Sequence, residues 1–283
     1  MLQGARIAVV VPAHNEAPLI AQVIDSMPSL VDHVIVVDDA STDGTGSKAE
    51  QRRDPRVRVV WHAANRGVGA AIATGYRLAS SAGARVVAVM AGDGQMDPKD
   101  LPSVLQPVLD GAADYVKGTR LAHPDASQMP VLRRLGTRAF GLATCAAMRL
   151  SALSALSDSQ CGYTAISSQA ISQLDLHRLW PGFGYPNDLL CQLRLHGLRV
   201  VEVPVRPVYG TEQSELKLRH MIVIAWLIAR GAWRIRRTQE PDAEPLQSQT
   251  PGLSLQTDQD ETIRSTPRYG RSAFGTVTDP SSF

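Results

Sequence analysis

The chain has 283 residues, of which 44% are hydrophobic and 20% are charged, so its length and composition predict one large domain or two small ones around a substantial core. A formal net charge of +2 gives no indication of nucleic-acid binding. The three cysteines are widely spaced and form no Cys-x-x-Cys pair, which argues against a zinc site and is typical of reduced thiols in the cytoplasm.

The first part of the chain alternates short, valine-rich runs with segments of helical periodicity. The apolar runs are nearly continuous, as in parallel strands that are covered on both faces. Predicted strands are residues 6–11, 33–37, 57–61, 86–90 and 114–117, and the helices between them are residues 16–27, 44–53, 67–81 and 100–109. This order predicts a doubly wound, mainly parallel α/β sheet flanked by helices, in which a ligand binds beyond the carboxyl ends of the strands.

Longer helices follow in the second part of the chain. The predicted strands there are 161–166 and 198–205, and the predicted helices are 130–153, 187–196 and 216–236. After Thr238 the sequence has too few large apolar side chains to offset the entropy cost of ordering, which predicts a disordered tail. We therefore divide the chain into a globular domain (1–215), an amphipathic helix (216–237) and a tail (238–283).

Polar residues follow the first two predicted strands. Pro12, His14 and Glu16 end the first strand, although Glu16 suits the start of a helix equally well. Asp38 and Asp39 end the second strand, where adjacent carboxylates suit hydrogen bonds to a nucleotide base or to ribose hydroxyls. Helix capping explains the residues that follow this pair better than it explains the pair itself.

Glycine-rich turns follow the third and fourth strands. Gly67 and Gly69 begin a helix where a backbone can approach a ligand closely, although a plain turn is the alternative. Gly92, Asp93 and Gln95 form a turn whose side-chain oxygens suit Mg²⁺ or Mn²⁺ beside a diphosphate, although a simple turn before a helix is again possible. Four such strand ends in register predict a nucleotide-diphosphate site.

These motifs together resemble the inverting glycosyltransferases of family two, which have the GT-A fold. Within that family they are most similar to the group of dolichol-phosphate mannose synthases and bacterial polyprenyl-phosphate glycosyltransferases. The resemblance covers about residues 6–217. It implies transfer of a sugar from a nucleoside-diphosphate sugar to a polyprenyl phosphate, with Mg²⁺ or Mn²⁺ as cofactor.

The resemblance also implies roles for individual residues. Asp93 and Gln95 would hold the metal, Arg120 would contact the donor phosphate, and Lys217 would close on the donor. Arg134 or Arg138 would lie close to the lipid phosphate. The residues that would bind the nucleotide, directly or nearby, are Pro12, His14, Glu16, Asp38, Asp39, Gly67 and Gly92.

One position departs from the family pattern. Members usually have Asp-x-Asp at the metal turn, but the first aspartate is replaced by Ala91, which removes a metal ligand or a water anchor. Asp97 is the candidate to compensate, unless Pro98 turns it toward the next helix. A catalytically weak nucleotide-sugar-binding protein is therefore one alternative function.

A second alternative is a transferase that acts on a soluble or saccharide hydroxyl. Such an acceptor requires a general base, whereas a phosphate is already ionised. Asp188 is the candidate base, although a carboxylate that stabilises the start of a helix is equally plausible. A nucleotidyltransferase is disfavoured, because no glycine-rich, arginine-containing loop follows the first strand.

The predicted helix at 216–236 suggests where the protein acts. Its apolar stretch at 221–229 is shorter than the roughly 20 residues that span a bilayer. Trp226, Trp233 and the flanking arginines suit a helix on an anionic membrane surface, and a core helix or a dimer contact is the alternative. The amino terminus lacks the features of a signal peptide, so we expect a cytoplasmic protein, peripheral on the cytoplasmic face of the membrane.

Overall fold

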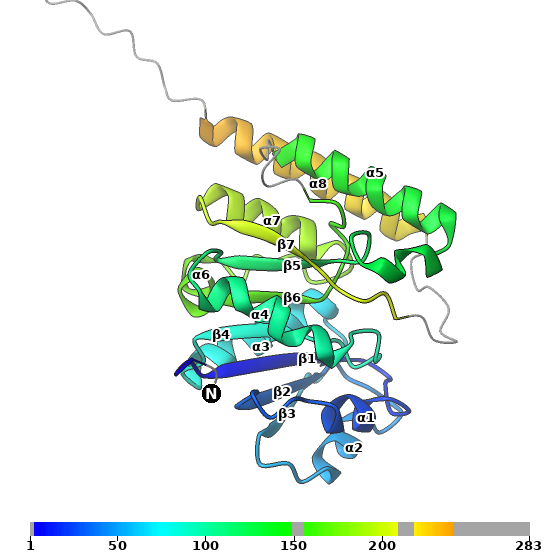
Figure 1. Cartoon of the computed structure of the whole chain (residues 1–283), viewed down its shortest axis with the longest axis vertical. Helices are drawn as coiled ribbons and strands as arrows, with labels where there is room; N and C mark the ends of the chain where they lie inside the picture. Colours follow the sequence, from blue (N-terminus) through cyan, green and yellow to red (C-terminus); the bar gives the residue numbers. More distant parts are fainter. Residues whose placement is uncertain (1–2, 149–155, 209–217, 240–283) are drawn as a thin grey trace, which may run out of the picture. The chain divides into compact units, whose positions relative to one another are not determined.

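The computed structural model describes residues 3–148, 156–208 and 218–239, which belong to one compact unit. Within this part of the chain, seven strands form one sheet in the order β3-β2-β1-β4-β6-β5-β7 (Figure 1). The strands are β1 (Ile7–Ala13), β2 (His33–Asp38), β3 (Val57–Trp61), β4 (Val86–Val89), β5 (Tyr115–Thr119), β6 (Thr164–Ser167) and β7 (Val200–Pro204). The helices are α1 (Ile20–Asp25), α2 (Thr45–Gln51), α3 (Val68–Ser81), α4 (Leu101–Leu109), α5 (Val131–Met148), α6 (Ser168–Gln173), α7 (Tyr185–Leu195) and α8 (Leu218–Gln239), with short 3-10 helices η1 (Pro98–Asp100) and η2 (Pro124–Gln128).

The direction of the strands brings many loops to one edge of the sheet. β1 is parallel to β2 and β4, and β2 is parallel to β3. β6 is antiparallel to both of its neighbours, β4 and β5, and β5 is parallel to β7. As a result β6 begins at the edge where the other six strands end. The mainly parallel, doubly wound sheet predicted from the sequence is confirmed.

Both faces of the sheet are covered, which explains the continuous apolar runs. Ile7, Val9 and Val11 of β1 pack in a core with α1, α2 and α4. Ala8 and Val10 point to the opposite face, into a core with α3, α6 and α7. Each fully buried valine or isoleucine of this strand contributes roughly 1.5–3 kcal/mol relative to exposure. β1 therefore contributes buried side chains to the hydrophobic cores on both faces of the sheet.

Two long helices lie beyond α7. α8 packs against α7 and α5, and Figure 1 shows α5 and α8 running side by side. Ile224, Leu227, Ile228 and Ile235 of α8 are buried in these contacts. Within the described ranges no helix combines the length and apolarity needed to cross a membrane. The predicted tail lies, from residue 240 onward, outside the described residues.

Some boundaries differ from the prediction. α1 begins at Ile20 rather than at Glu16, because Asn15 has a positive φ of 58° and the chain makes a turn before the helix, with Leu19 N donating to Glu16 O. α6 is absent from the prediction; its start is stabilised by the Ser167 side chain, which accepts a hydrogen bond from Ala170 N at 3.0 Å.

Candidate functional site

The four sequence motifs meet at the carboxyl edge of the sheet. Asp39 N donates to Ala13 O at 2.8 Å, and Gly92 N donates to Pro12 O at 3.1 Å. The loops that follow β2 and β4 therefore lie on either side of the end of β1. The loop after β3 joins them, because His62 N donates to Asp38 O at 2.9 Å. Asp39 and Asp93 thus belong to the same edge of the molecule.

The loops after β1 and β2 are held together by hydrogen bonds. His14 Nδ1 donates to Asp39 O at 2.8 Å, and Asn15 Nδ2 lies 3.2 Å from His14 Nε2. Asn15 N donates to Ser41 Oγ at 2.9 Å. Glu16 N donates to the hydroxyl of Thr45 at 2.8 Å, so Glu16 precedes α1 and contacts the start of α2. This arrangement orients the exposed ring of His14 before any ligand binds.

Asp38 and Asp39 are both buried, and both stabilise backbone turns. Asp38 accepts hydrogen bonds from Ser41 N at 2.8 Å and Gly46 N at 3.0 Å, at the start of α2. Asp39 holds the turn before α3, with Oδ1 accepting from Arg66 N at 2.9 Å and Oδ2 from Gly67 N at 2.6 Å. Contacts with the backbone of the chain therefore account for part of the hydrogen bonding of both carboxylates. A nucleotide contact by either carboxylate stays a prediction.

The glycines at the start of α3 admit another part of the chain. Gly69 N donates to Pro181 O at 2.7 Å, and Ala70 N lies 3.2 Å from the same oxygen. A Cβ at Gly69 would lie 2.1 Å from Trp180 O, and one at Gly67 would lie 2.5 Å from Pro181 O. The close approach expected from these glycines is thus to the 180–184 loop. Binding of a ligand at Gly67 stays a prediction.

The turn after β4 carries the predicted metal ligands. Gly92 is buried, and a Cβ there would lie 3.1 Å from Ala13 Cβ, so this turn packs tightly on the end of β1. Asp93 Oδ1 accepts a hydrogen bond from Gln95 N at 3.0 Å, which gives the turn its shape. Ala91 N contacts the sulfur of Met96 at 3.3 Å.

Asp97 does not replace the missing carboxylate at position 91. Its Oδ1 accepts a hydrogen bond from Lys99 N at 2.9 Å, and its Oδ2 faces Arg206 Nη1 at 3.7 Å. This carboxylate therefore stabilises the start of η1, as a residue before Pro98 commonly does.

The side-chain oxygens of Asp93 and Gln95 suit a cation that the phosphates of a substrate also help to bind. No group of three or more His, Cys, Asp or Glu side chains that could hold a metal occurs among the described residues. Mg²⁺ commonly takes one or two carboxylates from the protein and the rest of its ligands from substrate phosphates and water. One carboxylate, Asp93, and one carboxamide, Gln95, on a single turn fit that pattern.

Arg120, at the end of β5, is fixed by a buried aspartate. Its Nε and Nη2 donate to the two carboxylate oxygens of Asp158 at 2.8 and 3.1 Å. Burial raises the pKa of Asp158, but the charges of Arg120 and Lys117 outweigh burial and hold that pKa below its usual value. Asp158 therefore stays ionised at neutral pH and keeps the guanidinium in one orientation.

A second carboxylate supports the same segment. Glu202 of β7 accepts hydrogen bonds from Ser157 N at 2.9 Å, Ser157 Oγ at 2.7 Å and Asp158 N at 3.0 Å. Lys117, fully buried, donates from Nζ to Cys161 O at 2.6 Å, and burial lowers its pKa. Glu202 is not among the residues predicted from the sequence, although an acidic residue inside a valine-rich strand was a signal.

The residues predicted for the acceptor side, and Lys217, which is predicted to close on the donor, belong to several parts of the chain. Arg134 is half-buried and Arg138 exposed, both on α5. Asp188, in the first turn of α7, is buried; it accepts a hydrogen bond from Trp180 N at 3.0 Å and faces Arg234 Nη1 at 3.6 Å. Lys217 lies outside the described residues. The roles proposed for these four residues stay predictions.

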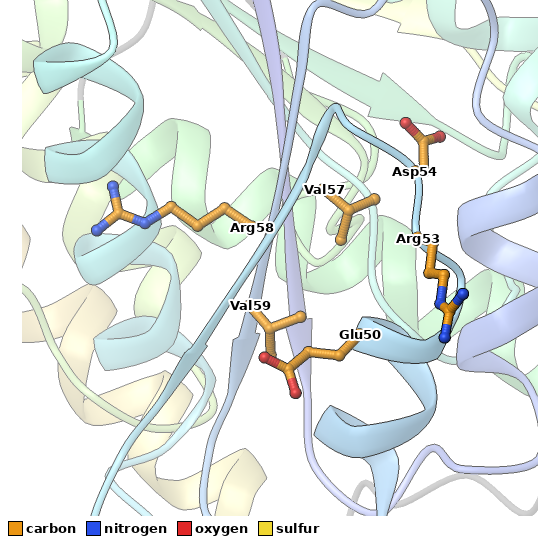
Figure 2. Close-up of a pocket in the computed structure, with 6 residues that line it drawn as sticks. All are labelled: Glu50, Arg53, Asp54, Val57, Arg58 and Val59. Atoms are coloured by element: carbon orange, nitrogen blue, oxygen red, sulfur yellow. The ribbon is translucent and has the colours of Figure 1, made fainter.

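A depression of about 540 Å³ lies elsewhere, on the outer edge of the sheet. Figure 2 shows the residues that line it, which come from the end of α2, the following turn and β3: Glu50, Arg53, Asp54, Val57, Arg58 and Val59. None of the predicted site residues is among them. The candidate site is therefore the edge formed by the strand ends and not this depression.

Comparisons with known proteins support the same family over most of the folded chain. Residues 8–155 match the family described as Glycosyl transferase family 2. The undecaprenyl-phosphate mannosyltransferase of Micrococcus luteus is 32% identical over 77% of this chain and 89% of that protein. The UDP-N-acetylglucosamine–dolichyl-phosphate N-acetylglucosaminyltransferase of Methanococcus voltae is 28% identical over 74% of this chain and 87% of that protein.

A solved structure shares the fold. Glucosyl-3-phosphoglycerate synthase from Mycobacterium tuberculosis, in complex with Mn²⁺, UDP and glucosyl-3-phosphoglycerate, has a TM-score of 0.61 at 23% identity and covers 85% of this chain and 82% of its own. The predicted GT-A architecture is confirmed by this likeness. The family match spans just over half of the chain, and together with the 32% identical relative it establishes that this chain belongs to glycosyltransferase family 2.

Proposed function

We propose that this glycosyltransferase moves a sugar, with inversion, from a nucleoside-diphosphate sugar to a polyprenyl phosphate at a membrane surface. The observation that carries the proposal is the similarity, over most of both chains, to relatives named as acting on undecaprenyl or dolichyl phosphate. The polyprenol monophosphomannose synthase of Mycolicibacterium smegmatis, 31% identical over 71% of this chain and 76% of that protein, is a third such relative.

Asp93 and Gln95 would hold a divalent cation, Mg²⁺ or Mn²⁺, against the diphosphate of the donor. When bound, such a cation supplies positive charge that stabilises a departing nucleoside diphosphate. Arg120 adds a second positive charge at the same edge of the sheet, and Asp158 fixes its orientation in advance. A cation that needs no rearrangement during the reaction stabilises developing charge efficiently.

The environment of Asp188 favours a phosphate acceptor over a hydroxyl acceptor. Its buried carboxylate accepts a hydrogen bond from Trp180 N and faces the guanidinium of Arg234, so contacts within the chain account for its position at the start of α7. A phosphate is ionised at neutral pH and requires no such base. Arg134 and Arg138 on α5 are the candidates to contact it. Transfer to a soluble or saccharide hydroxyl is the less supported alternative.

The outward face of α8 supports a membrane location. Met221, Ile222, Trp226 and Trp233 are exposed there, while the opposite face of the helix is buried. Arg230 lies over the ring of Trp226 at 5.3 Å, and Arg237 over that of Trp233 at 4.4 Å. Exposed indoles beside arginines suit the interface of an anionic bilayer. We therefore retain the division into a catalytic domain (1–215), a surface helix (216–237) and a tail (238–283).

A transfer assay tests the proposal directly. Purified full-length protein is incubated with labelled UDP- and GDP-sugars, with and without polyprenyl phosphate and Mn²⁺, and the lipid is extracted. We expect label in the organic phase with one donor, only when both lipid and cation are present. Asp93→Ala should abolish transfer, while Asp110→Ala, which removes an exposed aspartate at the end of α4, should not.

Two results would contradict different parts of the proposal. If label stays in water with every donor, the lipid acceptor is wrong. If the wild type shows no transfer, and Asp93→Ala binds the nucleotide sugar as tightly as the wild type does, the chain is a catalytically weak binding protein instead.

A further inference from the structure

Asp39 links three strand ends and the start of α3. Its backbone N–H bonds to the end of β1, its carbonyl accepts from the His14 ring, and its carboxylate holds Arg66 N and Gly67 N. The side chain is buried, so water contributes little to its hydrogen bonding. The loops after β1, β2 and β3, which carry most of the residues proposed to bind the nucleotide, are therefore tied to this one residue.

A histidine outside the predicted site residues donates a hydrogen bond to this carboxylate. His62, directly after β3, places Nδ1 2.6 Å from Asp39 Oδ1, and its side chain is as buried as that of Asp39. Because the carboxylate accepts, Nδ1 carries the proton and donates. With the two backbone N–H groups, Asp39 then has three donors, which leaves few orientations open to it.

The other ring nitrogen of His62 is also engaged. Nε2 lies 3.1 Å from the hydroxyl of Thr74, on the second turn of α3, and Arg77 Nη2 donates to the same hydroxyl at 3.1 Å. The imidazole thus connects the body of α3 to Asp39, while Asp39 connects to the turn that begins α3. A buried hydrogen-bond chain of this kind restricts rotation of every member.

We propose that His62 is a positioning residue of the donor site, acting through Asp39 on the 65–67 turn and on His14. The inference rests on the proposed nucleotide-sugar donor and extends it, because it assigns a role to a residue that need not touch the donor. A histidine that only stabilises the fold would, when replaced, lower the melting temperature and leave the nucleotide affinity of the folded protein unchanged.

Binding measurements on the full-length protein separate these two roles. We would titrate UDP and GDP, each with Mn²⁺ and without acceptor, by calorimetry, at a temperature where every variant is folded. For His62→Ala we expect about tenfold weaker binding of the preferred nucleotide, which corresponds to roughly 1.4 kcal/mol. His62→Asn, whose amide can donate in place of Nδ1, should recover binding to within about threefold of the wild type.

Two controls define what the loss means. His33→Ala removes a histidine from the opposite, amino end of β2 and should leave nucleotide binding unchanged. Affinity for polyprenyl-phosphate vesicles should be equal in His62→Ala and the wild type, since the effect is expected at the donor end alone. Equal losses for nucleotide and lipid would show general damage and would overturn the inference.

The remaining outcomes are equally decisive. A folded His62→Ala that binds nucleotide as tightly as the wild type, or a His62→Asn as weak as His62→Ala, rules out positioning through Asp39. If His62→Ala does not fold, Thr74→Val replaces it; unchanged binding by that variant also rejects the inference. If the wild type binds neither nucleotide, both the donor proposal and this inference are wrong. If the wild type binds a nucleotide but the His62 variants do not change its affinity as expected, only this inference is wrong.

Discussion

Buried carboxylates at the strand ends bind the backbone of their own chain. Asp38 accepts a hydrogen bond from Gly46 N in the first turn of α2, where helix N–H groups have no partner inside the helix, and Asp39 accepts from Arg66 N and Gly67 N in the turn before α3. Leaving such groups buried and unbonded would cost about 1–3 kcal/mol each. These aspartates therefore prepare the shape of the site, and any contact with a donor is an additional task for the same side chains.

The alanine at position 91 gives a prediction at this scale. Ala91→Asp adds a second carboxylate two residues before Asp93, so we expect tighter cation binding. The Mn²⁺ concentration that half-activates transfer should fall by roughly tenfold, or about 1.4 kcal/mol. Measured turnover against Mn²⁺ concentration tests this.

Ala91→Asn serves as the matched control, because it has nearly the same size without the charge, and it should shift the Mn²⁺ curve much less. An Ala91→Asp protein with the wild-type Mn²⁺ dependence would mean that position 91 does not face the cation.

At the scale of elements, close helix-to-sheet packing depends on small residues. A Cβ at Gly75 of α3 would lie 2.2 Å from Val10 Cγ1, and Val10 is fully buried in β1. The helix can approach the sheet this closely only because that side chain is absent. α3 carries the turn held by Asp39, so its distance from β1 also sets the geometry of the site.

Gly75→Ala should therefore destabilise the protein. Overpacking typically costs about 1–3 kcal/mol, which exceeds the gain in helix propensity of roughly 1 kcal/mol. Urea denaturation measures the change in the free energy of unfolding. Gly136→Ala on α5 is the comparison, because a Cβ there meets nothing within 4 Å and should raise stability by up to about 1 kcal/mol. Equal effects of the two changes would refute this packing argument.

The elements also show which features a sequence can reveal. Valine runs revealed β1, β2 and β4, because strands covered on both faces leave no polar alternation, and they revealed the partly exposed edge strand β3 as well. The short β6 carries no mark of its reversed direction, and the six-residue α6 is too short for helical periodicity to show. Motifs at strand ends could be assigned to one edge by topology alone. The contact of Pro181 O with Gly69 N could not, since it joins residues far apart in the chain.

At the scale of the whole molecule, charge is unevenly distributed. α5 contains three arginines and α8 five, and neither helix contains an acidic residue. Because the formal net charge of the chain is only +2, the remaining residues carry more negative than positive charge. The eight arginines of these two helices would be attracted to an anionic surface.

Vesicle binding tests this polarity. Trp226→Ala combined with Trp233→Ala should weaken sedimentation with phosphatidylglycerol vesicles by about tenfold or more, since both exposed indoles would enter the interface. Added salt should weaken binding of the wild type as well, by screening the arginines. Trp61→Ala is the control, because Trp61 is 50% exposed, close to the 51% of Trp226, but lies on β3. If all three proteins sediment alike, α8 does not contact the membrane.

The 180–184 loop has a practical consequence for anyone who shortens this chain. On one side, Pro181 O supports the first N–H groups of α3; on the other, Phe183 stacks on His220 at 4.5 Å and Gly184 packs against Leu227. A shorter catalytic fragment that ends at residue 216 would lack His220 and Leu227, which contact this loop. Loss of these contacts would loosen the loop and, through Pro181, the turn beside Asp39. α8 is thus structurally connected to the edge of the sheet proposed to bind the sugar nucleotide, and expression plasmids should encode both.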